Sequence, residues 1–187
     1  MGCRVIAGAF QQSGATVSGL VFVDGSFLGD DLESALKRVR AAIERAGMDA
    51  FTQQFFSDMF LENADPELRA RVIARARSLD ARFREDLFLD LVRWDATKLR
   101  DALRRTNVPA FVLQSTYVNS DLKRVSLPPG MTTPWMDAVA SLTQTSEASV
   151  IPDAGHMTMM EAAQSVNDAI EEFAAQRPQT SKAAARS

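Results

Sequence analysis

His156 is the only histidine among the 187 residues, and it occupies a stretch that predicts a loop between a strand and a helix. The apolar run at 148–151 predicts a short strand, and the spacing of Val166, Ile170 and Phe173 predicts the helix that follows. Histidine has the side chain whose ordinary pKa suits proton transfer near neutral pH. Two interpretations are open: His156 is a general base, or it is an ordinary polar residue of a loop.

A second candidate for chemistry, Asp24, directly follows the continuous apolar run at 20–23. Such a run is typical of a parallel strand that is covered on both faces. In open α/β sheets, ligands bind at the carboxyl ends of the strands. Asp24 is therefore placed either to take part in chemistry or to cap the turn that it forms with Gly25.

The segment around His156 reads Pro-x-Ala-Gly-His and continues with an apolar residue and Glu161. It resembles the histidine loop of the α/β-hydrolases. Residues 1–5 resemble the second half of their nucleophile elbow, Gly-x-Ser-x-Gly, and residues 17–26 resemble the strand that follows it. The resemblance implies that His156 is the general base and that Met1 is an oxyanion residue. It also implies a truncated or alternatively started chain, with the serine one position before Met1.

The resemblance offers two positions for the acid of the catalytic triad. The run at 110–114 is similar to the penultimate strand of the family, which is usually followed by an aspartate. Val118 stands where that aspartate is expected. Some family members carry the acid after the preceding strand of the sheet, and this position corresponds to Asp24. Asp121 is the reserve candidate.

The attacking group is the least determined part of the expected site. Four alternatives are open: water activated by His156, the Cys3 thiolate, the α-amino group, and a serine. Among the serines, Ser115 is the best placed because it directly follows a predicted strand, ahead of Ser26 and Ser126. Cys3 lies in a small apolar helix, where a cysteine usually belongs to the core.

Residues 31–94 are helical in pattern, and an insertion at this point resembles the cap that covers the substrate in many α/β-hydrolases. A stripe of phenylalanine and methionine at 51–60 either lines an apolar substrate pocket or forms ordinary helix core. We assign four side chains to substrate binding: Phe55, Met59, Trp135 and Met157.

Composition narrows the class of protein. Apolar residues make up 46% of the chain, which is enough for a core, and the net charge of -3 shows no nucleic-acid footprint. No apolar run approaches the roughly 18 residues of a membrane helix. A single cysteine excludes an intrachain disulfide and fits a reducing compartment, so we expect a cytoplasmic protein. We expect no cofactor and no metal.

The expected fold class is α/β: a partial α/β-hydrolase fold with a short parallel sheet, flanking helices and a helical cap at about 31–94. One domain covers 1–176, and a disordered tail is expected at 177–187. A sheet of about three strands leaves open edges, so we expect a homodimer or a higher oligomer. The expected function is hydrolysis of small ester or acyl substrates. The alternative is an inactive fragment that binds a ligand or forms oligomers.

Overall fold

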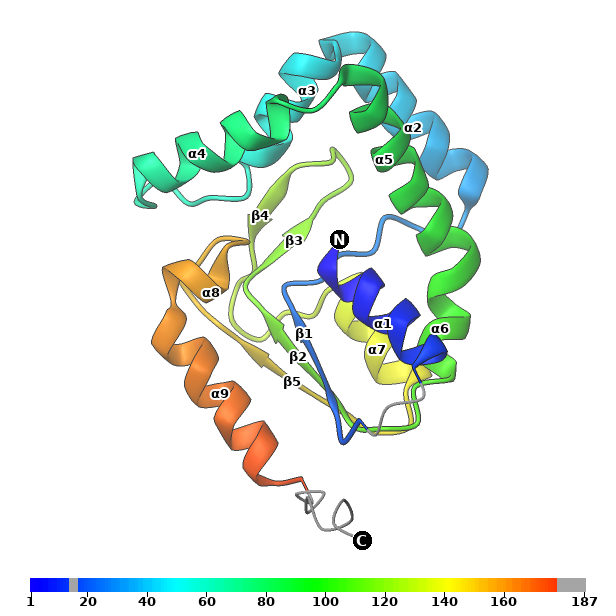
Figure 1. Ribbon diagram of the computed structural model, residues 1–187, viewed down its shortest axis with the longest axis vertical. Coiled ribbons are helices and arrows are strands. Elements are labelled where there is room, and N and C mark those ends of the chain that lie inside the picture. The colour runs from blue at the N-terminus through cyan, green and yellow to red at the C-terminus, as the bar shows by residue number, and fades with distance from the viewer. Residues whose placement is uncertain (14–16, 178–187) are drawn as a thin grey trace, which may run out of the picture.

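A computed structural model describes residues 1–13 and 17–177, so most of the expected tail lies outside the described residues. Its centre is a parallel sheet of three strands, β1 (Leu20–Val23), β2 (Ala110–Gln114) and β5 (Ser146–Val150), in the order β1-β2-β5 (Figure 1). Every residue of β2 is buried, as expected of a central strand that is covered on both faces. The predicted short parallel sheet is confirmed.

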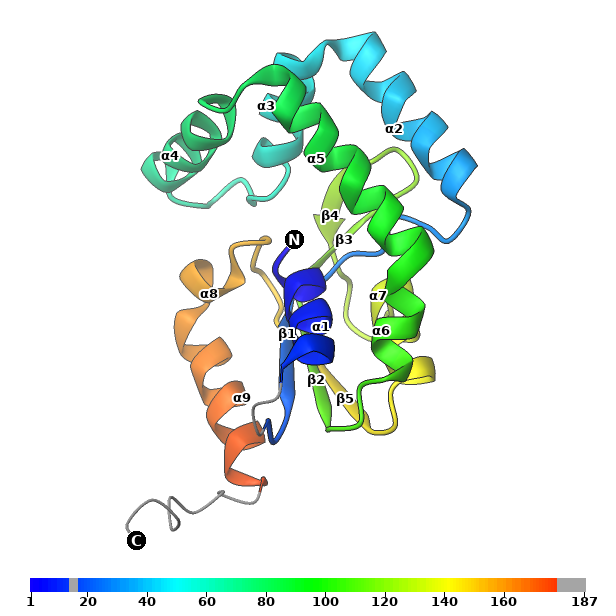
Figure 2. The same ribbon diagram turned by 45° about the vertical axis from the view of Figure 1, so that its right-hand side comes forward.

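Helices cover both faces of this sheet. On one face, α1 (Gly2–Gln12), α6 (Arg100–Arg104) and α7 (Pro134–Leu142) pack against side chains such as Phe22 and Val112. On the other face, α9 (Ala163–Ala175) packs against Phe111 and Leu113 (Figure 2). The alternation of side chains along β2 therefore divides the core into two layers.

Four helices form the cap: α2 (Leu32–Ala46), α3 (Met48–Ser57), α4 (Pro66–Arg77) and α5 (Ala81–Trp94). Helices α2, α3 and α5 share a core, and α4 packs through Leu68 against Met59 and Phe60 in a second, smaller cluster. The four helices lie beyond the carboxyl end of the sheet (Figure 1). Three of them begin at an aspartate whose side chain accepts a backbone N–H bond: Asp31 at α2, Asp65 at α4 and Asp80 at α5. The π-helical turn η1 (Asp95–Leu99) joins α5 to α6, so one long rod connects the cap to the sheet layer.

Three elements were not expected from the sequence. The strands β3 (Thr116–Val118) and β4 (Arg124–Ser126) form an antiparallel hairpin, and α8 (Thr158–Glu161) is a single turn after the histidine loop. The hairpin turn depends on the Asn119 side chain, which accepts N–H bonds from Asp121 and Lys123. Two three-residue strands are too short for periodicity to predict, so the only sequence signal was this polar turn.

Gly25 allows a tight contact at the end of β1. A Cβ at this position would lie 2.2 Å from Nε1 of Trp135, whose side chain is 1% exposed and packs edge-on against Phe22. Trp135 was assigned to substrate binding, but the structure places it in the core of the sheet layer. It holds the turn that carries Asp24.

We expect Gly25→Ala to lower the free energy of unfolding by about 2 kcal/mol or more, because a rigid buried indole has no room to move. Gly8→Ala is the matched control, since its new Cβ meets only Trp94, at 3.8 Å. Helix propensity should stabilise that variant by up to about 1 kcal/mol. Urea unfolding measures both. Equal stability of the two variants would contradict the close contact at Gly25.

Candidate active site

The histidine loop is held by two N–H bonds, one to the cap and one to a side chain in the turn that follows the loop. The N–H of His156 donates to the carbonyl oxygen of Met59 at 2.7 Å, and the N–H of Gly155 donates to Glu161 at 3.2 Å. A Cβ on Gly155 would lie 2.5 Å from the same Met59 oxygen, so a glycine is required for this approach. The loop therefore places His156 between the sheet and the cap.

Asp24 and His156 meet where the strands end. His156 Nδ1 lies 2.7 Å from Asp24 Oδ2. Asp24 has a φ of 47°, a left-handed conformation that turns the chain sharply at the end of β1. The two residues are 132 positions apart in the sequence, and the parallel sheet brings them together by aligning the carboxyl ends of β1 and β5.

The Asp24 carboxylate accepts five further hydrogen bonds. Ser115 donates its N–H (2.8 Å) and its hydroxyl (3.1 Å), and Thr116 donates its N–H (2.7 Å) and its hydroxyl (2.5 Å). Arg124 donates from Nη1 at 2.9 Å. The residue is 2% exposed, so these donors replace the water that the carboxylate has lost.

The environment fixes the charge of both partners. Burial alone raises the pKa of Asp24, but the hydrogen bond from His156 and the charge of Arg124 outweigh it and hold this pKa below the ordinary 3.8. Burial lowers the pKa of His156 below the ordinary 6.5, against the opposing hydrogen bond to Asp24. At neutral pH an ionised Asp24 therefore accepts the Nδ1 proton of a neutral His156, which leaves Nε2 free to take a proton.

His156 lines a cavity of about 370 Å³. Its sheet end is formed by the start of α1, Ser26 and Arg124. The remainder is mostly apolar and extends under the cap between α3, α4 and α5. The apolar side chains there include Phe55, Phe56, Met59, Leu87, Phe88 and Leu91. A mostly apolar cavity with a few polar groups at one end is the usual form of a small-molecule site.

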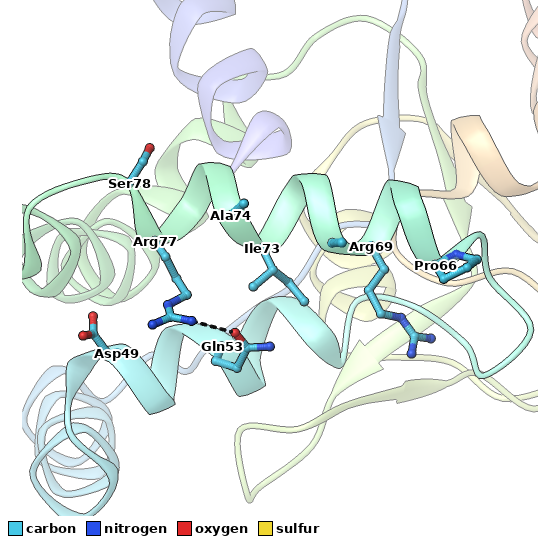
Figure 3. A pocket seen from close by; sticks show the side chains of 9 residues that line it. Asp49, Gln53, Pro66, Arg69, Ile73, Ala74, Arg77 and Ser78 are labelled. Carbon is cyan, nitrogen blue, oxygen red and sulfur yellow. Dashed lines mark hydrogen bonds between the residues drawn. The ribbon is translucent and has the colours of Figure 1, made fainter.

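A larger, more open hollow of about 710 Å³ lies on the cap between α3 and α4 (Figure 3). Its lining includes Asp49, Pro66 and Arg77, and Arg77 is hydrogen-bonded to Gln53. None of the side chains predicted for the site lines this hollow. The cavity that contains His156 is therefore the candidate active site.

The structure brings only some of the predicted residues into the cavity. Met1, Phe55, Met59 and Met157 line it together with His156.

The Ser115 hydroxyl is buried and is bonded to Asp24, to the Gly155 oxygen and to Thr158. Asp121 lies in the turn of the hairpin, with its own N–H bonded to Asn119. Among the described residues, the partner of His156 Nδ1 is Asp24 and not Asp121.

Cys3 is also placed away from the cavity wall. It is 7% exposed, and its thiol donates to the Val23 oxygen. Burial raises its pKa to about 11, so the thiol stays neutral at physiological pH. Among the described residues, no group of three or more histidine, cysteine, aspartate or glutamate side chains is arranged to hold a metal ion.

Sequence reasoning missed Arg124. The residue is 8% exposed, and its Nη1 donates to Asp24 and to the Thr116 hydroxyl. An acid had been expected at Val118. Arg124 lies six residues later, and the hairpin brings it back to the end of β1. Only the polar turn at 119–121 indicated that the chain reverses here, and it did not show which side chain would return.

We expect Asp24→Asn to lower the free energy of unfolding by about 3 kcal/mol or more, because it leaves Arg124 buried without its counter-charge. Asp121→Asn, a change at an exposed turn, should stay within about 0.5 kcal/mol of the wild type. Chemical denaturation of both variants measures the difference. Equal stability of the two variants would contradict a large contribution of the buried network to the free energy of unfolding.

Comparison with known proteins identifies the family. The family model described as the alpha/beta hydrolase family matches residues 1–169. No curated protein matches the chain. Of the helices in the described residues, none has the length and apolar character needed to cross a membrane.

Solved structures share the fold. A thermophilic esterase from Thermogutta terrifontis, solved with malate bound, is 20% identical with a TM-score of 0.63, over 94% of this chain and 62% of that one. A bromoperoxidase from Bacillus anthracis is 14% identical with a TM-score of 0.63, over 91% and 63%. An enol-lactonase from Burkholderia xenovorans LB400 is 18% identical with a TM-score of 0.58, over 93% and 61%.

The chain thus spans about three-fifths of the length of these relatives, and its fold is partial relative to theirs. The predicted family and fold class are confirmed. Because the family model matches most of its length, the chain belongs to the alpha/beta hydrolase family.

Proposed function

We propose that the protein hydrolyses small ester-like substrates, with His156 as general base and Asp24 as the carboxylate that orients it. The observation that carries this proposal is the 2.7 Å contact between His156 Nδ1 and Asp24 Oδ2 at the wall of an apolar cavity. An ionised carboxylate beside Nδ1 fixes the tautomer whose Nε2 can accept a proton. It also stabilises the imidazolium that forms.

In the proposed reaction, Nε2 of His156 takes a proton from the attacking group as that group adds to the substrate carbonyl. The resulting oxyanion lies at the start of α1, where the Met1 and Gly2 backbone lines the cavity and the helix dipole favours negative charge. The imidazolium then gives its proton to the leaving alkoxide, and the carbon–oxygen bond breaks. Phe55, Met59 and Met157 hold the apolar part of the substrate.

We propose water as the attacking group among the alternatives within the described chain. The neutral buried Cys3 thiol and the fully engaged Ser115 hydroxyl support this choice. Ser26 lines the cavity and is the second candidate. The same geometry would serve a serine directly before Met1, because Met1 lies in the cavity wall with His156.

The second candidate function is non-catalytic binding of a ligand in the same cavity. The observation that favours it is the state of the two predicted nucleophiles, since neither Cys3 nor Ser115 is presented to the cavity. A cavity of this size with apolar walls suits a small ligand whether or not the ligand is turned over.

The two functions differ in how turnover depends on His156. Hydrolysis of p-nitrophenyl butyrate should rise with pH through a midpoint below 6.5, as His156 loses its proton, because burial lowers the pKa of this residue. His156→Ala should abolish that rise and lower the rate by at least about a hundred-fold. Asp121→Asn is the control and should keep the wild-type profile. Equal turnover by folded wild type and His156→Ala would exclude the catalytic proposal and favour the binding function.

We further propose that the protein is cytoplasmic, since its single cysteine fits a reducing compartment.

We also propose that the protein self-associates. The apolar side chains of Val5 and Ile6 on α1 are 59% and 38% exposed. Within the described residues, β1 pairs with β2 and leaves its other edge open. Association of two copies would cover both features.

Light scattering should therefore give a mass of at least twice 20.5 kDa at micromolar concentration. Val5→Glu, which adds charge to the exposed patch, should lower that mass, whereas Gln164→Glu on α9 should not change it. A wild-type mass near 20.5 kDa would contradict self-association.

A further inference from the structure

The sheet end of the cavity is bordered by two buried arginines. Arg4 and Arg124 are 5% and 8% exposed, and both line the cavity. Their carboxylate partners, Asp95 and Asp24, have no exposed side-chain surface. Among the described residues, the cavity lining contains neither aspartate nor glutamate. A ligand in the cavity would therefore contact the guanidinium groups but not the carboxylates that are paired with them.

Both guanidinium groups keep unused hydrogen-bond donors. Arg4 bonds through Nε and Nη2, and Arg124 bonds through Nη1 alone. Among the bonds of the described residues, none uses Arg4 Nη1 or Arg124 Nη2. Arg124 Nε is buried without a partner. An anionic ligand group in the cavity would accept charge-assisted hydrogen bonds from the unused donors.

The third arginine of the cavity, Arg84, also has a buried Nε without a partner, but its terminal nitrogens differ from those of Arg4 and Arg124. Arg84 uses Nη1 for the Thr52 hydroxyl and Nη2 for Asp49, so both of its terminal nitrogens are occupied. An anion is therefore better accommodated at the sheet end of the cavity than at the cap end.

Two further features favour negative charge at the sheet end. The first residues of the 11-residue helix α1, Met1 and Gly2, line the cavity beside the arginines, and a helix N-terminus attracts anions. Burial lowers the pKa of Arg124, and the charge of Arg4 adds to this lowering against the opposing charge of Asp24. The two guanidinium groups thus repel each other, and an anion between them would relieve that repulsion.

The rest of the cavity suits an apolar chain. Arg84, Leu87, Phe88 and Leu91 follow the i, i+3, i+4, i+7 spacing of one helix face and line the cavity along about 10 Å of α5. Phe55 and Met59 line the cavity from the α3 side.

We propose that this cavity binds a carboxylate carried on an apolar chain, with the carboxylate between Arg4 and Arg124 and the chain along α5. The ligand class is thus a medium-chain carboxylic acid. If the proposed function holds, the bound acid is the product of ester hydrolysis, which remains beside His156. The proposal rests on the proposed function in this respect. Binding itself requires no turnover.

Calorimetry with octanoate at pH 8 tests the proposal, and octanamide serves as the neutral probe of the same chain length. Octanoate should bind at least about ten-fold more tightly than octanamide, since charge-assisted hydrogen bonds are stronger than neutral ones. Arg124→Lys and Arg4→Lys keep a cation beside their acids and remove the free guanidinium donors. Each should weaken octanoate binding about ten-fold and leave octanamide binding unchanged.

Arg93→Lys, an exposed arginine paired with Asp90, is the matched control and should bind both probes as the wild type does. Circular dichroism checks the fold of each variant, and the wild-type comparison of the two probes stands without any variant. Equal affinity for octanoate and octanamide, no octanoate binding, or unchanged octanoate affinity in folded Lys variants would overturn the proposal. Loss of ester turnover with octanoate binding intact would contradict only the proposed function.

Discussion

The buried carboxylate of Asp24 is the interaction on which the site depends. It is surrounded by donors from three places in the chain: the end of β2, the hairpin strand β4, and the histidine loop. A single ionised group thus fixes the relative positions of segments up to 132 residues apart. Removing its charge would leave several buried donors unsatisfied at once, so the local structure and the orientation of His156 have the same origin.

Sequence patterns predicted the elements that follow simple periodicity. The apolar runs at 20–23 and 110–114 predicted the buried strands, and apolar residues at helical spacing predicted the cap and the flanking helices. Asp24 could be chosen because buried parallel strands present their carboxyl ends at one edge of the sheet. Its partnership with His156 was offered by the family resemblance and not by periodicity, because periodicity does not give the strand order.

The remaining features depend on contacts between distant residues. The hairpin strands have three residues each, which is too few for a period to be recognised, so Arg124 could not be assigned to Asp24. Trp135 was assigned to substrate binding but belongs to the core of the sheet layer. Its true neighbour is Gly25, whose missing side chain leaves room for the indole. Ser115 was ranked as the best-placed serine because it follows a strand, whereas its hydroxyl is enclosed by Asp24, Gly155 and Thr158.

The π-helical turn η1 has a mechanical consequence for the cap. Asp95, its first residue, accepts bonds from the Arg4 side chain and from the N–H of Leu28, so it joins the rod α5–η1–α6 to α1 and to the segment that leads into α2. Both connections between cap and sheet are therefore fastened at one carboxylate. On the opposite side, the described backbone contact is the bond from the His156 N–H to the Met59 oxygen. The cap is therefore fastened to the sheet layer at Asp95, and its contact with the histidine loop is a second point of attachment.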